Sequence, residues 1–325
     1  MTWPHARVVS LPLRTLFRGV VDREVMLFEG PNGWAEWSPF LEYSDEEAAV
    51  WLNGAIEFAF GAEPQIRRDK IAVNATLPAV AADAVLATLA PFGQFGTVKI
   101  KVAEAGQTPG QDVDRIVAVK QNYPSAKIRL DANGGWTPKL SFSFIKALAV
   151  QGIALEYLEQ PCKTIAELAE LKQLIADSEF DVKIAADESV RRVADPLEVA
   201  AAGAADILVI KAQPLGGIAR ALEISAQAGL PVVVSSALES SVGLSMGAHL
   251  AAALPELEFD CGLGTAALLA GDVTREPLRP VDGFIDVRRV EIDESKLDIF
   301  EAEDHRIDWW IDRLNRSFDL LNPAS

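Results

Sequence analysis

Residues 97–102 read TVKIKV, a short apolar segment that carries two lysines, Lys99 and Lys101. Successive side chains of a β-strand point to opposite faces, so both lysines leave one face while three aliphatic residues share the other. The common interpretation of such a strand is a charged face in contact with water, because lysine is seldom buried without a partner. The alternative is a chemical role for the two lysines, and the rest of the chain favours it.

Seven further short apolar runs resemble this segment, and stretches with helical patterns separate all eight. The seven are IAVNATL (71–77), KIRLDAN (127–133), ALEYLEQP (154–161), VKIAADES (182–189), DILVIKA (206–212), PVVVSSALES (231–240) and LEFDCGL (257–263). Strands that alternate with helices and are almost continuously apolar are typical of a parallel sheet covered by helices. Eight such units predict an α/β fold with a closed barrel, since the first run lacks the glycine-rich turn of doubly wound nucleotide-binding folds.

The chain on either side of the barrel predicts a second, smaller domain. Residues 1–68 read as an α+β unit, with two extended segments around a Pro-Asn-Gly turn and a helix that begins at the capping box of Ser44 and Glu47. Residues 69–285 form the predicted barrel. Residues 286–325 are expected to return and pack on the N-terminal domain, because one helical stripe is apolar. That stripe comprises Ile307, Trp310, Ile311, Leu314, Phe318 and Leu321.

Composition excludes several classes of function. The formal net charge of −17 disfavours nucleic acid and anionic membranes as partners, because both are bound through Lys and Arg. Neither a basic start followed by a long apolar run nor a stretch of about 20 apolar residues occurs, so a cytoplasmic location is expected. Cys162 and Cys261 are too few for a disulfide framework and are expected to be small buried residues. The three histidines lie in no triad or zinc pattern.

One ionisable residue stands at the end of each of five successive runs. These residues are Lys101, Asp131, Glu159, Asp187 and Lys211, at intervals of 30, 28, 28 and 24 residues. The chemistry of a (β/α) barrel lies at the carboxyl ends of its strands, and one βα unit occupies about 30 residues. Each carboxylate taken alone has a plainer interpretation as a helix cap or turn residue. The joint pattern favours a catalytic site.

The three acidic residues belong to consecutive runs, so Asp131, Glu159 and Asp187 are expected side by side as a cluster of oxygen ligands. Three neighbouring carboxylates cannot all ionise unless a cation neutralises them. Oxygen ligands without histidine or cysteine favour Mg²⁺, with Mn²⁺ as a second possibility. The sequence therefore predicts a divalent metal site.

Lys101 and Lys211 lie on runs four positions apart in a ring of eight, which places them on opposite sides of that metal. This arrangement suits the removal of a proton next to the carboxylate of a small-molecule substrate, since the ion stabilises the resulting negative charge. Lysine must be neutral to act as a base. Lys99 is expected to lower the pKa of Lys101 through like-charge repulsion, so Lys101 is the predicted base.

Two loops offer weaker signals. Ser236 and Ser240 follow the run at 231–234, and their hydroxyl and amide groups could receive a substrate carboxylate, although an ordinary polar loop explains them equally well. Gly216 and Gly217 precede a helix and could bind a phosphate, but without the fuller motif a turn is the better interpretation.

These motifs resemble the enolase superfamily, and within it the muconate lactonizing subgroup. The resemblance is carried by KIK (99–101), LDAN (130–133), LEQP (158–161), ADES (186–189) and IK (210–211). It implies a modified TIM barrel of the (β/α)7β type with an α+β N-terminal capping domain completed by the C-terminal segment. It also implies Mg²⁺ on the three carboxylates and acid–base roles for Lys101 and Lys211. The segment GWAEWSPF (33–40) resembles the capping-domain strand that leads to a loop closing the site.

Softer motifs are similar to a compact dehydratase branch of the subgroup. They are RLDANGGW (129–136), SSALESSVGL (235–244) and DCGLGTAALLAGDV (260–273). This branch implies a lyase that catalyses the syn dehydration of a succinyl-substituted hydroxycyclohexadiene carboxylate to an aromatic acid. The residues expected to bind the substrate are Ser236, Ser240, Gly262, Arg129 and Asn133.

Two alternatives stay open. An N-succinylamino acid racemase or dipeptide epimerase would use Lys101 and Lys211 as paired bases, and Asp260 could supply the acidic specificity element of an epimerase. A non-catalytic barrel that only binds a partner would have lost a ligand or a lysine, and none is lost. No oligomeric state is predicted.

Overall fold

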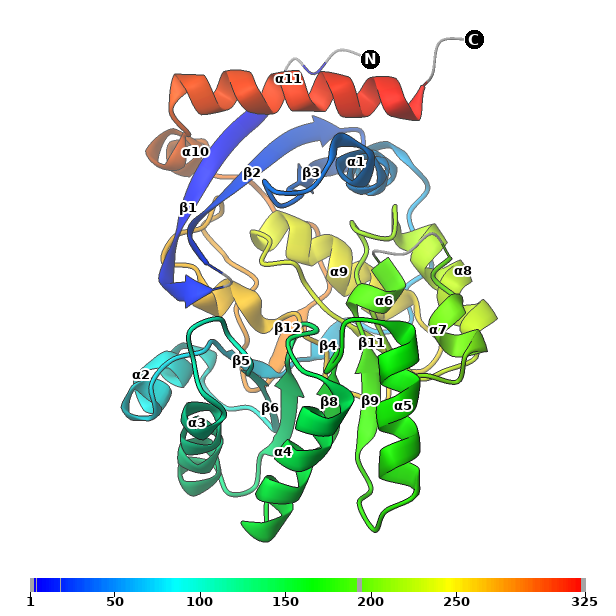
Figure 1. Ribbon diagram of the computed structural model, residues 1–325. Helices are drawn as coiled ribbons and strands as arrows, with labels where there is room; N and C mark the ends of the chain where they lie inside the picture. Colours follow the sequence, from blue (N-terminus) through cyan, green and yellow to red (C-terminus); the bar gives the residue numbers. More distant parts are fainter. Residues whose placement is uncertain (1–2, 4, 18, 192–194, 323–325) are drawn as a thin grey trace.

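The computed structural model describes residues 3, 5–17, 19–191 and 195–322. Two units make up the molecule: a barrel, and a smaller unit that lies over one end of it (Figure 1). We call the smaller unit the cap. It contains the N-terminal strands and helix together with the last two helices of the chain.

The cap is built on an antiparallel sheet in the order β1-β2-β3, with one helix packed beside it. Its elements are β1 (Arg7–Phe17), β2 (Val20–Gly30), β3 (Gly33–Trp37) and α1 (Asp45–Phe60). The sequence predicted only two extended segments here, and β1 is additional. Its register shifts after Pro12, which has no N–H to donate and fits only an edge strand. The predicted capping box is present, with Ser44 and Glu47 each accepting a backbone N–H at the start of α1.

The C-terminal segment packs on the cap through α10 (Glu294–Phe300) and α11 (Asp304–Leu321). Helix α11 contacts both α1 and β1 and forms the outer edge of the molecule (Figure 1). The side chain of Trp310 is fully buried, its ring centroid lies 5.3 Å from that of Trp37, and its Nε1 donates to Glu24 Oε2 at 2.7 Å. The predicted stripe was wrong at Ile311, which is 40% exposed because the buried face turns toward Arg313 and Leu314 instead. The domain boundaries given above stay predictions.

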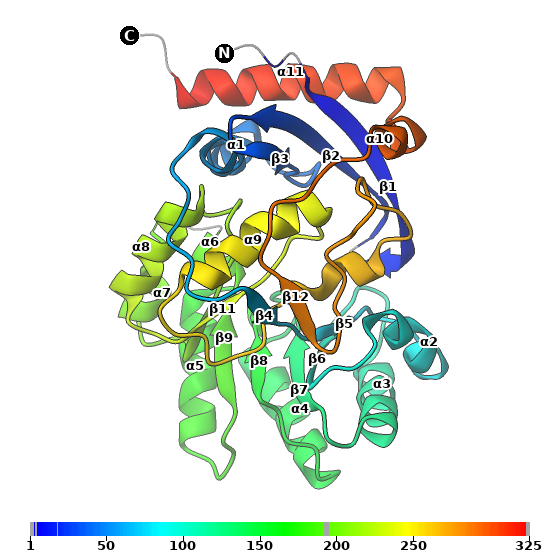
Figure 2. The same ribbon diagram turned by 180° about the vertical axis from the view of Figure 1, so that it is seen from behind.

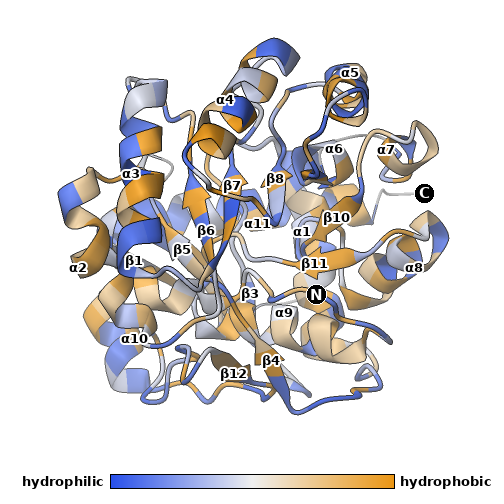
Figure 3. Cartoon of the chain, turned by 90° about the horizontal axis from the view of Figure 1, so that it is seen from below, coloured by the Kyte–Doolittle hydropathy of each residue, from blue (hydrophilic) through white to orange (hydrophobic). Residues whose placement is uncertain are grey.

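The barrel contains a parallel sheet of seven strands in the order β5-β6-β7-β8-β9-β10-β11. Their bounds are β5 (Ala75–Leu77), β6 (Thr97–Lys101), β7 (Lys127–Asp131), β8 (Tyr157–Glu159), β9 (Lys183–Ala186), β10 (Ile207–Ile210) and β11 (Val232–Val234). Seen from below in Figure 3, the mostly apolar strands lie inside helices α3, α4 and α5, which cover them. This arrangement confirms the predicted mixed α/β barrel.

Two of the eight predicted strands differ from expectation. The run at 71–77 divides into β4 (Lys70–Ala72), which pairs with β12 (Phe284–Asp286), and β5 of the barrel. The run at 257–263 forms only two single bridges, Cys261 to Val73 and Gly262 to Ser235. Those bridges are nevertheless hydrogen-bonded on both sides, with Cys261 N donating to the carbonyl of residue 72 at 2.7 Å and Gly262 N to that of residue 234 at 2.8 Å. They close the ring between β11 and β5.

Helices connect the strands. Their bounds are η1 (Ala82–Ala84), α2 (Val85–Leu89), η2 (Ala90–Phe92), α3 (Pro109–Asn122), α4 (Pro138–Val150), α5 (Ile165–Ala176), α6 (Glu188–Arg191), α7 (Glu198–Ala201), α8 (Ile218–Ala228), α9 (Ser241–Ala253) and η3 (Gly264–Leu268). Thr137 and Thr164 cap α4 and α5. Every residue of α9 is buried, because this helix lies between barrel and cap (Figure 2). Both cysteines are buried and free, as expected. In the part of the chain that the structure describes, no helix combines the length and apolarity needed to cross a membrane.

The packing of α11 generates a first prediction. Replacing Trp310 with Ala should lower the free energy of unfolding by about 3–5 kcal/mol, because a fully buried ring and its hydrogen bond are lost. The change Ile311→Ala on the same helix should cost no more than about 0.5 kcal/mol, since that side chain is largely exposed. Urea unfolding of the two variants measures both values, and equal losses would contradict this packing.

Candidate functional site

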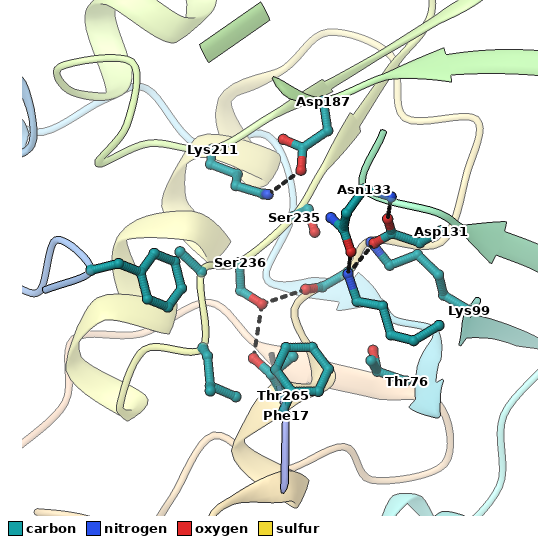
Figure 4. A pocket seen from close by; sticks show the side chains of 15 residues that line it. Phe17, Thr76, Lys99, Asp131, Asn133, Asp187, Lys211, Ser235, Ser236 and Thr265 are labelled. Atoms are coloured by element: carbon teal, nitrogen blue, oxygen red, sulfur yellow. Dashed lines mark hydrogen bonds and ion pairs between the residues drawn. The ribbon is translucent and has the colours of Figure 1, made fainter. Parts of the chain in front are cut away.

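A pocket opens at the carboxyl ends of the barrel strands, beneath the cap (Figure 4). The barrel supplies most of its wall, and two aromatic side chains of the cap complete it. The lining residues are Phe17, Phe40, Thr76, Lys99, Lys101, Asp131, Asn133, Asp187, Lys211, Ser235, Ser236, Ala237, Leu238, Gly262 and Thr265. We call this cavity the mouth pocket.

Strand register explains why charged groups gather here. Lys101 on β6 is level with Asp131 on β7, which is level with Glu159 on β8. Asp187 directly follows β9, and Lys211 directly follows β10. The structure therefore brings the five ionisable residues predicted from the sequence to one end of the barrel. Glu159 is buried beside the pocket and does not line its surface.

Each lysine is paired with a carboxylate. Lys101 Nζ lies 2.5 Å from Asp131 Oδ2, and Lys211 Nζ lies 2.7 Å from Asp187 Oδ2. Lys99 Nζ donates to both oxygens of Glu159, at 2.8 and 2.9 Å, and lies 3.3 Å from Asp131 Oδ2. Strand β6 thus directs both of its lysines into the barrel rather than into solvent.

Burial and charge act in opposite directions on these groups. Burial opposes ionisation of Asp131, but the ammonium groups of Lys101 and Lys99 outweigh it and hold the pKa of Asp131 well below its usual range. Burial also opposes the charged form of Lys99, yet Glu159 and Asp131 hold the pKa of Lys99 well above its usual range. Burial and the charge of Asp131 raise the pKa of Glu159 to about 7. The positive charge of Lys99 is already balanced by Glu159. That Lys99 lowers the pKa of Lys101 therefore stays a prediction.

Arg191 on α6 is a site residue that sequence reasoning missed. Its guanidinium donates to Asp187 Oδ1 at 2.9 Å, to Glu188 Oε1 at 2.7 Å and to the hydroxyl of Tyr43 at 2.9 Å. Burial disfavours the ionised form of Asp187, but Arg191 and Lys211 lower its pKa below the usual range. The available signal was the spacing of Arg191 four residues after Asp187, which places both on one helical face.

The three carboxylates fit a divalent cation in chemistry, but they do not form the predicted cluster. Within the described ranges, no three His, Cys, Asp or Glu side chains converge closely enough to hold a metal ion. Ammonium groups already pair with these carboxylates: Lys99 contacts both Asp131 and Glu159, Lys101 contacts Asp131, and Lys211 contacts Asp187. The donor set still consists only of carboxylate oxygens, on three neighbouring strands of one sheet, which is the set that Mg²⁺ and Mn²⁺ prefer.

Three of the predicted substrate-binding residues line the mouth pocket. Ser236 Oγ lies 2.8 Å from the carbonyl of Gly262 and 2.8 Å from Thr265 Oγ1. Gly262 leaves no room for a side chain, because a Cβ there would lie 2.5 Å from Ser235 Oγ. Asn133 accepts from Lys101 Nζ at 2.7 Å, on a backbone with φ of 45°. These groups surround the base predicted at Lys101.

The structure does not place Ser240, predicted to bind the substrate, on the pocket surface, because its hydroxyl is used within the fold. Ser240 caps α9, its Oγ accepting from Val242 N, and both its N–H and its hydroxyl donate to Glu36 Oε2. It is fully buried and does not line the pocket.

Arg129, also predicted to bind the substrate, does not line the pocket either. Arg129 shares its face of β7 with Asp131 but lies two residues nearer the start of the strand, which places it deeper in the barrel. There it donates to Glu156 Oε2, Asn74 Oδ1 and the carbonyl of Asp260 at 2.6, 3.0 and 2.6 Å.

The position of Asp260 weakens the epimerase alternative. Its Oδ2 accepts from Thr97 Oγ1 at 2.6 Å, at the start of β6 and therefore at the end of the barrel opposite the mouth pocket. Asp260 does not line the pocket and is not the acidic specificity element considered above.

A buried carboxylate of the cap lies behind the pocket wall. Glu36 on β3 is fully buried and accepts from Ser38 Oγ at 2.6 Å and from Ser240 N at 3.0 Å. Burial and the neighbouring charge of Glu239 raise the pKa of Glu36 to about 7, although the serine hydroxyls and the guanidinium of Arg23 oppose the rise. No pattern in the sequence distinguished this residue from an ordinary strand glutamate.

Comparisons with known proteins agree with this architecture. The family model described as "Enolase N-terminal domain-like" matches residues 8–59, and the model described as "Enolase C-terminal domain-like" matches residues 79–293. The curated o-succinylbenzoate synthase of Mycobacterium bovis (strain BCG / Pasteur 1173P2) is 50% identical over 317 residues, covering 98% of this chain and 94% of that protein. The o-succinylbenzoate synthase of Mycobacterium leprae (strain TN) is 49% identical over 318 residues, covering 98% and 92%.

Solved structures support the fold. The muconate lactonizing enzyme from Pseudomonas putida superimposes with a TM-score of 0.73 at 21% identity, covering 91% of this chain and 98% of that one. The L-Ala-D/L-Glu epimerase from Bacillus subtilis, solved as a substrate-liganded complex, gives a TM-score of 0.73 at 22% identity, covering 89% and 96%. At these identities the likeness concerns the fold alone.

The pKa of Glu36 generates a second prediction. Its value near 7 in the folded chain exceeds the ordinary 4.5, so the folded state binds the extra proton between these two values. The stability that this group contributes is therefore full below about pH 4.5 and is lost as the pH rises through about 7, by at most about 1.4 kcal/mol per pH unit. Urea unfolding at pH 5, 6 and 7 should show that the change Glu36→Gln removes this slope. Parallel pH profiles for the two proteins would contradict it.

Proposed function

Because the chain belongs to the enolase superfamily, we propose that it is a cytoplasmic o-succinylbenzoate synthase. The reaction is the metal-dependent syn dehydration of 2-succinyl-6-hydroxy-2,4-cyclohexadiene-1-carboxylate to o-succinylbenzoate, a step of menaquinone biosynthesis. The observation that carries the proposal is the placement of Lys101 and Lys211 in one pocket, each held by a carboxylate at a strand end. Identity of about half over almost the whole chain to curated o-succinylbenzoate synthases supports the choice of substrate.

Asp131, Glu159 and Asp187 would hold Mg²⁺ or Mn²⁺, which supplies positive charge that stabilises the negative charge developing on the substrate carboxylate. The protein's own contribution is to keep these groups buried and ordered. Their strands are hydrogen-bonded neighbours, and each side chain is at most 1% exposed. A buried site of this kind strengthens electrostatic stabilisation because little water screens it.

Lys101 is the proposed base. As a neutral amine its Nζ removes the proton next to the ring carboxylate, and the resulting ammonium then gives that proton to the departing hydroxyl group on the same face. The C–H and C–O bonds break, a C=C bond forms, and water leaves as the ring becomes aromatic. Asn133 Oδ1, 2.7 Å from Nζ, orients the amine throughout.

Lys211 is proposed to stay charged on the opposite side. Its ammonium group would lie against the face of the substrate ring and stabilise it through charge and cation–π contact. Phe17 and Phe40 of the cap cover the pocket and exclude water from it. Ser236 and the backbone at Gly262 supply polar groups for the succinyl part of the substrate.

One alternative reaction uses the same two lysines. If Lys101 and Lys211 exchanged protons across the substrate, the enzyme would racemise an N-succinylamino acid, and the presence of both amines in the pocket is the observation in its favour. A non-catalytic binding protein would have no need of two buried lysines in one cavity.

The first test of this function is turnover. Purified protein with Mg²⁺ should form o-succinylbenzoate, followed by its ultraviolet absorbance. The change Lys101→Ala should lower kcat by about 10²–10⁴-fold, because the general base is removed. Chelation should abolish the activity and added Mg²⁺ should restore it. Racemisation of N-succinylamino acids in the absence of dehydration would replace the proposal with the alternative.

A second test measures metal binding without turnover. The change Asp131→Asn should weaken Mn²⁺ binding by about tenfold or more in a calorimetric titration, because one carboxylate ligand is lost. The matched control is Asp260→Asn, which alters a carboxylate at the other end of the barrel and should leave Mn²⁺ affinity unchanged. Equal affinities in both variants would remove Asp131 from the ligand set.

A further inference from the structure

A buried carboxylate of the cap contacts one pocket loop. Glu36 Oε2 accepts from Ser240 N at 3.0 Å, from Gly243 N at 3.2 Å and from the hydroxyl of Ser240. These donors belong to the first turn of α9, whose N–H groups have no partner within the helix. A side chain from the cap thus completes a helix of the barrel.

The loop held in this way forms one wall of the mouth pocket. Residues 235–240, which we call the β11 loop, connect β11 to α9, and their first four side chains line the cavity. Arg23 of the cap strand β2 supports the same loop, its guanidinium donating to the carbonyls of Leu238 at 3.3 Å and Ala237 at 3.4 Å. The first two residues are held by the barrel, because Ser235 N and Ser236 N donate to the carbonyls of residues 210 and 262 at 2.9 and 3.1 Å. The cap contacts reach residues 237–240, so the position of this later part of the loop depends on the docked cap.

The backbone of the β11 loop needs such support. Leu238 has φ of 64°, a left-handed conformation that costs a residue with a side chain about 1 kcal/mol or more and persists only where its surroundings impose it. Gly243 shows the same adaptation from the helix side. A Cβ at this position would lie 2.9 Å from Glu36 Cδ and 2.5 Å from Glu239 Cβ, so only glycine lets the carboxylate approach.

We propose that Glu36 is a positioning residue: by capping α9 from the cap, it fixes residues 237–240 of the β11 loop and thereby the part of the substrate-binding wall formed by Ala237 and Leu238. This role rests on the proposed function only in so far as the pocket binds that substrate. It makes the shape of the binding wall dependent on contact between cap and barrel. Glu36 does not line the pocket and acts through the loop.

The chain contains a matched control for this contact. Glu57 on α1 of the cap also caps a barrel helix, its Oε1 accepting from Ile218 N at 2.9 Å and Ala219 N at 3.0 Å at the start of α8. The carboxylate of Glu57 also lies where a phosphate would have to bind before α8. This agrees with the interpretation of Gly216 and Gly217 as a turn. The first turn of α8 does not line the mouth pocket. Glu57 therefore makes the same kind of contact between cap and barrel without reaching the binding wall.

The test combines hydrogen–deuterium exchange with steady-state kinetics on the full chain. The change Glu36→Ala should increase deuterium uptake in residues 235–243 and raise KM about tenfold, with a smaller change in kcat, because three hydrogen bonds to a buried acceptor oxygen are lost. Glu36→Gln keeps an acceptor oxygen and should stay within about threefold of wild type in both readouts. Glu57→Ala should lower thermal stability and leave the exchange of residues 235–243 and KM unchanged.

Each outcome decides the question. Unchanged exchange of the β11 loop in Glu36→Ala, or equal effects of Glu36→Ala and Glu57→Ala on KM, would overturn the proposal in favour of a merely structural contact. If Glu36→Ala does not fold, Ser240→Ala removes one donor to the same carboxylate and should show the same local increase in exchange. Because exchange is measured without substrate, a protein that lacked the proposed dehydratase activity would still test the positioning role.

Discussion

The site depends on one electrostatic constraint, that charges buried at the carboxyl ends of the barrel strands must find opposite charges within the protein. Asp131, Glu159 and Asp187 are at most 1% exposed, and an ionised carboxylate without a partner would be very costly there. Three lysines on the neighbouring strands, each 6% exposed, supply the partners. The alternation of side chains along β6 is what makes this possible, because it sends both of its lysines inward while the aliphatic face packs outward on the helices.

The antiparallel sheet of the cap obeys the same constraint at its two faces. Toward α11, Glu24 is held by Arg306 and by the indole N–H of Trp310. Toward the barrel, Glu36 is held by the first turn of α9. The two carboxylates stand on adjacent strands of the small sheet, one turned toward α11 and one toward the barrel. Polar contacts with defined partners therefore fix the cap in register on the barrel, where apolar packing alone would allow it to slide.

The sequence predicted what repeats along the chain and missed what is made by contact between distant segments. The strand ends with Lys101, Asp131 and Lys211 could be predicted because strand alternation and βα spacing are local rules. Ser240 and Arg129 lie near the pocket in sequence, yet neither lines it, because each bonds a segment more than 50 residues away, Ser240 to Glu36 and Arg129 to Asn74.

The same limit explains the remaining differences. The run at 257–263 is apolar enough for a strand, but it meets its neighbours over only two residues, so it closes the barrel by single bridges.

The charges at the mouth pocket balance one another. Three ammonium groups balance three carboxylates, and Arg191 balances Glu188. A site that is neutral in this way gains two positive charges with a divalent cation, and the proposed substrate carries two carboxylates that match them. The raised pKa of Glu159, near 7, points the same way, since its ionised form is the one that added positive charge would favour. Substrate and cation would therefore stabilise each other in the pocket, and the lysines, relieved of their carboxylates, would be available to the substrate.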